Sequence, residues 1–131
     1  MKSFFSISIT TSIASLFLVS CSPIAPPAPH GSVDHVVVIW LKNPGNPTDR
    51  QAILTASDNL RRIPGLRTLD SGFPLPSDRP VVDDSFDIAF TMRFDSVNSL
   101  NAYECDPRHL KEVAEVLKPL SQKILVYDIT R

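Results

Sequence analysis

Four stretches of the chain have the hydrophobic pattern of β-strands. Residues 33–41 are rich in β-branched side chains and apolar on both faces, which predicts a central strand. Residues 86–94 alternate most clearly between apolar and polar positions, whereas residues 66–73 and 123–129 have weaker strand patterns. The large side chains of the alternating stretch share one face of the predicted strand: Phe86, Ile88, Phe90, Met92 and Phe94.

The segments between these strands have helical or loop patterns. Thr48 and Gln51 have the spacing of a capping box, and the helix that they begin ends before Pro64-Gly65. Its apolar side chains recur at helical spacing: Ile53, Ala56, Leu60 and Ile63. Residues 74–85 contain three prolines and several aspartates, which predicts an exposed loop and a candidate lid.

A second helical segment is interrupted at Pro107. Asp95 or Ser96 caps a short helix, and Asp106 is a natural N-cap for a new helix that has Pro107 at its first position. Side chains at helical spacing are expected to point inward from the new helix: Leu110, Val113, Val116, Leu117 and Leu120.

The order of elements is β-α-β-β-α-β, with the second helix broken. This order predicts an α+β, ferredoxin-like fold, in which a four-stranded antiparallel sheet carries its helices on one face. Trp40, Leu125 and Tyr127 place large apolar side chains on the other face of the sheet, which would be exposed to solvent unless another element covers it. A second copy of the sheet is the simplest cover, so we expect a homodimer.

Composition and charge fit a single small domain. The chain has 131 residues, 43% of them hydrophobic, and a formal net charge of −1, which gives no electrostatic reason to expect nucleic acid as a partner. A basic start precedes an apolar run over residues 4–19 that is short and diluted by Ser and Thr, as in a secretory signal. The sequence therefore predicts that the folded domain begins after an exported leader.

The leader ends in Leu18-Val19-Ser20-Cys21, which resembles the lipoprotein box of bacteria. We expect residues 1–20 to be a signal peptide, residues 21–32 a lipidated Cys21 with a proline-rich tether, and residues 33–131 the domain. Acyl chains on Cys21 would hold the protein to a membrane without a spanning helix. Ser22 after the cysteine favours the outer membrane of the cell envelope, with the protein facing the periplasm.

Five polar or reactive side chains are candidates for chemistry. The break at residue 107 brings Tyr103 near His109, a phenol and an imidazole that are able to do acid–base chemistry or simply pack. His35 faces the helices, where a strand histidine is more often hydrogen-bonded to a carboxylate in the core than a ligand or a base, and Asp128 on the last predicted strand is a further candidate. Cys105 is either a nucleophile or, as is more common for a lone helical cysteine, a small buried hydrophobe.

These side chains and the third predicted strand leave two interpretations of the interior. A pocket lined by Phe86, Ile88, Phe90 and Met92 would suit a small apolar ligand, whereas the size of the same side chains favours a filled core. His35, His109 and Asp128 have the residue types of a metal triad, but nothing in their spacing requires one. We expect neither a metal nor another cofactor.

Together the residues resemble the stress-responsive dimeric alpha/beta-barrel (Dabb) family. The resemblance runs from His35 through Asp128 and rests on an ordered set of short matches: His35 opening the first strand, Ile63-Pro64-Gly65, Phe94-Asp95-Ser96, Tyr103, Asp106-Pro107-Arg108-His109, Leu117-Lys118-Pro119-Leu120 and Val126-Tyr127-Asp128. Membership implies the fold and a dimeric α/β barrel, but it does not imply one reaction.

A plant polyketide cyclase of the family suggests roles for four positions. By that resemblance, His109 would be the general base, Tyr103 would donate a hydrogen bond to the enolate oxygen, and Asp128 would orient an imidazole. His35 is matched as well, and the resemblance makes Asp128 its expected partner, in a structural or an orienting role. The cyclase has histidines where this chain has Ile88 and Asp106.

Three hypotheses follow. The first is a membrane-tethered dimer with a stress-related or small-apolar-ligand-binding function and no established catalysis. The alternatives are a cofactor-independent lyase or cyclase and a purely structural dimer.

Overall fold

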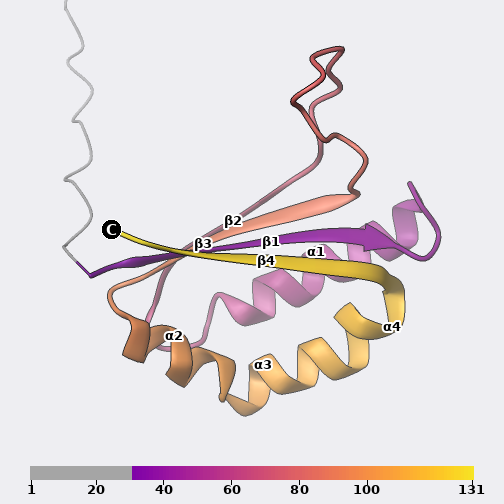
Figure 1. Cartoon of the computed structure of the whole chain (residues 1–131). Coiled ribbons are helices and arrows are strands. Elements are labelled where there is room, and N and C mark those ends of the chain that lie inside the picture. Colours follow the sequence, from indigo (N-terminus) through magenta and orange to yellow (C-terminus); the bar gives the residue numbers. More distant parts are fainter. Residues whose placement is uncertain (1–30) are drawn as a thin grey trace, which may run out of the picture.

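One antiparallel sheet of four strands organises the computed structural model, which describes residues 31–131 (Figure 1). The strands lie in the order β2-β3-β1-β4, with these bounds: β1 Val33–Leu41, β2 Leu66–Gly72, β3 Ile88–Phe94 and β4 Ser121–Thr130. The predicted signal peptide, Cys21 and nearly all of the predicted tether lie outside the described residues.

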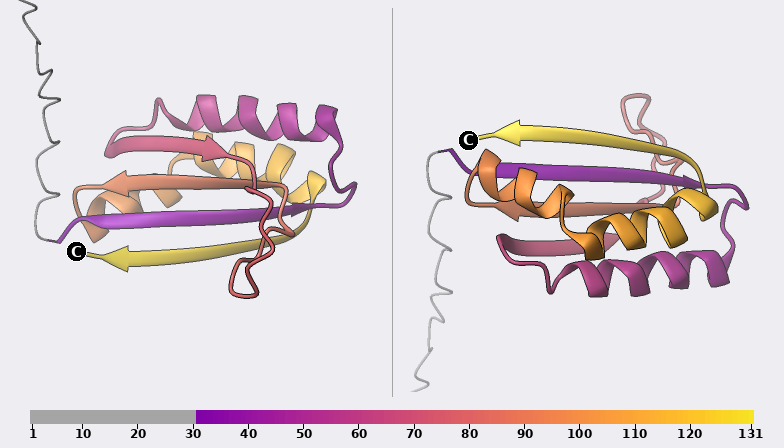
Figure 2. Two further views of the ribbon diagram at one scale, coloured as in Figure 1. Left: turned by 90° about the horizontal axis from the view of Figure 1, so that it is seen from above. Right: turned by 90° about the horizontal axis from the view of Figure 1, so that it is seen from below.

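All helices cover the same face of the sheet. They are α1 (Pro47–Leu60), α2 (Val97–Glu104), α3 (Pro107–Glu112), the π-helix η1 (Val113–Leu117) and α4 (Lys118–Leu120). The right-hand view of Figure 2 shows the helices in front of the sheet, and the left-hand view shows the opposite, bare face. The predicted ferredoxin-like architecture is therefore confirmed. None of the helices within residues 31–131 has the length and apolar character needed to span a membrane.

The core lies between the helices and the inner side of β1 and β3. Burial alternates along β1, so that His35, Val37 and Ile39 point to the helices. The largest completely buried side chains come from both layers: Tyr103, Phe90, Phe94, Ile39, Leu41, Ile53, Leu60 and Ile88. The register of β1 against β4 places His35 directly opposite Asp128.

The structure identifies the N-caps of two helices, and one of them differs from the sequence prediction. The N-cap of α1 is Asn46, whose side-chain oxygen accepts hydrogen bonds from the amides of Thr48 and Asp49, so Pro47 takes the first helical position. Ser96, and not Asp95, caps α2. The predicted capping box of Thr48 and Gln51 is therefore wrong, because the helix begins one residue before Thr48.

Phe86 does not belong to β3. It precedes the strand and packs edge to face against Trp40, with ring centroids 6.4 Å apart, on the bare side of the sheet. The next residue, Asp87, is the cause: its side chain is turned inward, is only 3% exposed, and binds groups of β1 and α1. The prediction that Phe86 shares a face with Ile88 is therefore wrong.

The loop that joins β2 to β3 rises from the bare side of the sheet (Figure 1). Leu75 and Val81 of this loop are strongly exposed. Because the helices and the space beneath them lie on the opposite side, the loop does not close over that space, and the predicted lid is wrong.

The helical segment after Pro107 also departs from its predicted face. Leu110 is 55% exposed, whereas Leu117 is buried and Val113 packs at the edge of the core. The π-helix η1 widens the turn between them, which puts Leu110 out of phase with Leu117. Cys105 is exposed as well, so it is not the small buried hydrophobe that the sequence favours.

Candidate functional site

A cavity of about 470 Å³ lies between the sheet and the helices. The sequence favours a filled core here, and the structure shows instead that β4, α3 and η1 stand apart far enough to leave this space. Its walls are mostly apolar, with polar groups on β1, β4, α2 and α3. The lining residues are His35, Val37, Leu60, Phe90, Met92, Tyr103, Glu104, His109, Val113, Leu117, Lys118, Ile124, Val126 and Asp128.

His35 and Asp128 form the polar wall on the sheet side. The Nδ1 atom of His35 lies 2.6 Å from Oδ1 of Asp128. Because a carboxylate only accepts, Nδ1 carries the proton and donates it, which leaves Nε2 as an acceptor in the neutral ring. His35 is 6% exposed, whereas Asp128 is open to solvent at the edge of the sheet. The predicted partnership of these two side chains is present, and it fixes the orientation of the imidazole.

His109 and Tyr103 meet where α2 gives way to α3, with ring centroids 4.7 Å apart. Asp106 accepts a hydrogen bond from the Arg108 amide and caps α3, and the Arg108 side chain and amide lower the pKa of Asp106 to about 2. The cap fixes the first turn of α3, which carries His109. The Nδ1 atom of His109 lies 3.0 Å from the backbone oxygen of Glu104, so this nitrogen also carries the proton.

Tyr103 lines the same space, and its hydroxyl is bonded to another lining residue. It donates a weak hydrogen bond to Sδ of Met92 at 3.5 Å. Burial, and next the nearby charge of Glu104, raise the pKa of Tyr103 far above its ordinary value. Tyr103 is therefore a neutral phenol throughout the physiological range, with its oxygen still free to accept.

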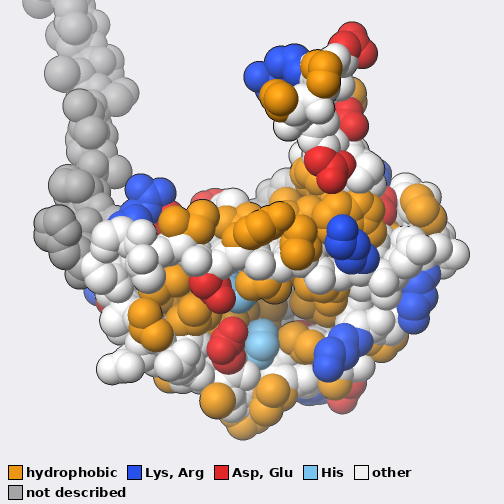
Figure 3. Space-filling model, viewed as in Figure 1, with side chains coloured by type: hydrophobic (Ala, Val, Ile, Leu, Met, Phe, Trp, Pro, Cys, Tyr) orange, Lys and Arg blue, Asp and Glu red, His pale blue; other side chains and the backbone are white. Residues whose placement is uncertain are grey.

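Both Nε2 atoms lack a protein partner in the described part of the chain and are not completely buried. Within residues 31–131, the two imidazoles form hydrogen bonds through Nδ1 alone. The completely buried side-chain nitrogens and oxygens without a partner belong to other residues. A nitrogen without a partner that is not buried is accessible to water, and both rings line the cavity. Figure 3 shows the histidine side chains in the hollow between β4 and the helices, with acidic side chains beside them and apolar side chains around them.

The remaining sequence candidates divide into two groups. Phe90 and Met92 line the cavity, as the pocket interpretation expects, whereas Ile88 is completely buried in the core and does not reach it. Sequence reasoning missed Glu104, Lys118 and Val126. The sequence could have indicated Val126, since it lies two residues before Asp128 and therefore on the same face of the strand. The π-helix, which places Lys118, leaves no such signal.

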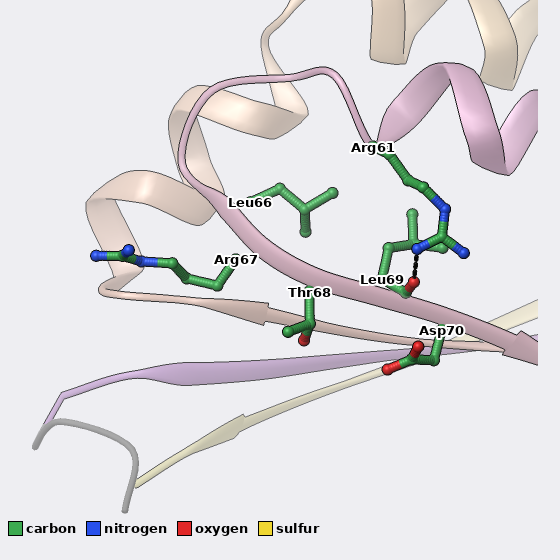
Figure 4. Close-up of a pocket in the computed structure, with 6 residues that line it drawn as sticks. All are labelled: Arg61, Leu66, Arg67, Thr68, Leu69 and Asp70. Atoms are coloured by element: carbon green, nitrogen blue, oxygen red, sulfur yellow. Dashed lines mark hydrogen bonds between the residues drawn. The ribbon is translucent and has the colours of Figure 1, made fainter. Parts of the chain in front are cut away.

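A second hollow, of about 340 Å³, lies at the outer edge of β2 (Figure 4). Arg61 reaches across it from the end of α1 and donates a hydrogen bond to the backbone oxygen of Leu69, while Arg67 points away and pairs with Asp95. The polar side chains do not converge there. Arg61 covers part of the edge strand β2, and the hollow itself lacks the features of a binding site.

No three His, Cys, Asp or Glu side chains of residues 31–131 are grouped closely enough to hold a metal ion. The set of His35, His109 and Asp128 therefore does not form the metal triad considered from the sequence. The polar groups of the cavity are arranged as hydrogen-bonding groups: two imidazoles and a phenol, within reach of a common ligand.

Solved structures of other proteins have the same fold. A hydroxynitrile lyase from Passiflora edulis is 24% identical, with a TM-score of 0.68 over 79% of this chain and 95% of the lyase. A Dabb family protein with a ferredoxin-like fold from Mesorhizobium loti is also 24% identical, with a TM-score of 0.65 over 78% of this chain and 98% of that protein.

A dimeric protein of unknown function from Bacteroides fragilis, also with a ferredoxin-like fold, is 17% identical, with a TM-score of 0.61 over 78% of this chain and 98% of that protein. These identities are low, so the three likenesses show the fold alone. No curated protein matches the chain.

The family comparison covers the whole folded part. The family model of the stress responsive A/B barrel domain, Dabb, matches residues 33–131. This range includes every strand and helix described above. The chain therefore belongs to the Dabb family of stress responsive A/B barrel domains.

Proposed function

We propose that the cavity binds a small, mostly apolar molecule. The observation that carries this proposal is the space of about 470 Å³, with apolar walls and three convergent polar side chains, His35, Tyr103 and His109. Binding sites for small molecules have this size and this balance of apolar walls and a few placed polar groups. A ligand there would gain the packing contacts that the walls lack when the space holds only water.

Ethylbenzene tests this binding, because it offers apolar contact alone. At about 1 mM it should raise the midpoint of thermal unfolding (Tm) by about 3–6 °C, given a dissociation constant on the order of 0.2 mM. Differential scanning fluorimetry measures this shift. A Tm that stays unchanged with this and related apolar probes would contradict ligand binding and would leave the purely structural dimer.

A second candidate function is proton abstraction next to a carbonyl group. His109 supports it, because its Nδ1 atom is held by the Glu104 carbonyl and its Nε2 atom is a free acceptor beside a neutral phenol. The fold is also that of the Passiflora edulis hydroxynitrile lyase. The protein should then exchange the α-protons of phenylacetone in deuterated water, and His109→Ala should abolish the exchange while leaving the ethylbenzene effect on Tm. Equal exchange in both proteins would contradict this function.

We infer that the protein is a homodimer joined through the bare face of the sheet. The Bacteroides fragilis protein of the same fold is dimeric, and apolar side chains of β1 and β4 lie uncovered on this face, with Tyr127 52% exposed. Trp40, Phe86 and Leu125 line a notch beside Tyr127. The β2–β3 loop rises on the same side and would flank the second copy (Figure 2).

Tyr127→Asp should convert this dimer to a monomer, because a carboxylate would be buried at the centre of an apolar interface. Sedimentation velocity measures the change. Leu110→Asp is the matched control, since Leu110 is equally exposed but lies on the helix side. A wild-type monomer, or an equal effect of the two substitutions, would contradict the proposed interface.

The lipid anchor is also a proposal. Its support is the sequence Leu18-Val19-Ser20-Cys21, which precedes the proline-rich segment. Acylation of Cys21 would place the domain at the bacterial envelope, at the outer membrane facing the periplasm, and a stress-related role accords with the family. The mass of the mature protein should show cleavage before Cys21 and added acyl chains; an unmodified Cys21 would refute the anchor.

A further inference from the structure

The hydrogen-bonding groups of the cavity have a definite polarity. In their neutral forms His35 and His109 each use Nδ1 as a donor, to Asp128 and to the Glu104 carbonyl, so that Nε2 of each ring is an acceptor. Tyr103 supplies a hydroxyl that now bonds only to a thioether sulfur, which is a weak acceptor. The site therefore offers two acceptors and one donor whose present bond is easily replaced.

The charges around the cavity are predominantly negative. Glu104 and Asp128 contribute two carboxylates to the lining, and Lys118 contributes one ammonium group. A carboxylate or phosphate on the ligand would lie near the acceptor nitrogens and the two carboxylates, which repel it. Only the ammonium group of Lys118 in the lining would attract it. The lining thus disfavours an anionic head group.

We propose that the polar head of the ligand is an uncharged hydroxyl group, which donates to an imidazole Nε2 and accepts from the Tyr103 hydroxyl. A hydroxyl is both a donor and an acceptor, so it satisfies both kinds of group at once. An ether or a ketone only accepts and leaves the imidazoles without a partner, and an ammonium group only donates. This inference rests on the proposed binding function and specifies the class of ligand: small apolar alcohols and phenols.

Four probes of nearly equal shape test the inference: 4-ethylphenol, its methyl ether 4-ethylanisole, ethylbenzene and 4-ethylbenzoate. Dissociation constants are measured by NMR titration at pH 8.5, where free imidazole is neutral and a phenol is still protonated. We expect 4-ethylphenol to bind about 5–10-fold more tightly than 4-ethylanisole or ethylbenzene, and 4-ethylbenzoate to bind most weakly.

The outcomes separate this inference from the binding function on which it rests. Equal affinity for 4-ethylphenol and ethylbenzene, or tightest binding of 4-ethylbenzoate, overturns the hydroxyl head and leaves the apolar site intact. Failure of all four probes to bind overturns the binding function itself.

Two substitutions locate the acceptors. His35→Phe and His109→Phe, combined in one protein, keep ring-sized side chains but remove both Nε2 atoms. This variant should still bind ethylbenzene, and its preference for 4-ethylphenol should fall below about 2-fold. Leu110→Phe, outside the cavity, should keep the full preference. A double variant that retains the preference contradicts the proposed contacts, and if it fails to fold, the probe series on the native protein decides.

Discussion

Replacing Asp87 with Ala should lower Tm by about 15 °C at pH 7, which corresponds to about 3 kcal/mol of unfolding free energy. The Asp87 carboxylate accepts hydrogen bonds from the amides of Leu41 and Gly45 and from the guanidinium of Arg50, at 2.9, 2.6 and 2.9 Å. Removing it leaves a buried amide and a partly buried cation without their partner. Thermal unfolding followed by circular dichroism measures the loss.

The same effect should depend on pH in a defined direction. Burial by itself raises the pKa of Asp87, but the hydrogen bonds from Leu41, Gly45 and Arg50 outweigh it, so that the pKa lies below the ordinary value. The folded protein therefore binds this proton less tightly than the unfolded chain does. The stabilisation is complete above the unfolded-state pKa of about 4 and is lost as the pH falls through the lower folded-state value.

The difference in Tm between native protein and Asp87→Ala should accordingly narrow below about pH 4. Asp58→Ala is the control, because Asp58 forms an exposed ion pair with Arg61 and should change Tm little at any pH. A drop of less than about 3 °C at pH 7, or an equal difference at pH 7 and pH 3, would contradict the role assigned to Asp87.

Val126→Trp should weaken the binding of ethylbenzene, raising its dissociation constant at least about 10-fold. Val126 lines the cavity from β4, and it is 43% exposed, so a larger side chain has room to enter without displacing the core. The indole would occupy part of the space that the ligand needs. Loss of the ethylbenzene effect on Tm, with the Tm of the free protein nearly unchanged, is the expected result.

Leu110→Trp adds the same side chain on the helix side, at a position that does not line the cavity. It should bind ethylbenzene as the native protein does. If Val126→Trp binds as well as Leu110→Trp, the ligand site is elsewhere.

The sequence carried enough information for the architecture because each strand and helix has its own local signal. The β-branched run of residues 33–41 and the helix break at Asp106-Pro107 are readable without knowledge of their neighbours, and the structure has both where they are predicted. The pairing of His35 with Asp128 is implied by the resemblance to the family, and the register of β1 against β4 places the two residues opposite each other.

The errors arise where distant residues decide the conformation. Asp87 turns inward because it accepts hydrogen bonds from residues that lie 37–46 positions away in the chain. Phe86 is carried to the opposite face as a result. The π-helix turns Leu110 outward without any special residue in the sequence. The cavity exists because whole elements stand apart, and the size of Phe90 and Met92 alone does not reveal the remaining space.

The space between the sheet and the helices should bind ethylbenzene in solution. A titration of methyl-labelled protein with ethylbenzene, followed by NMR, tests this proposal. We expect shifts at cavity methyl groups, those of Val37, Leu117 and Val126, while Val38 and Leu125 in the notch of the bare face stay unchanged. Shifts confined to Val38 and Leu125, or no saturable shifts at all, would contradict it.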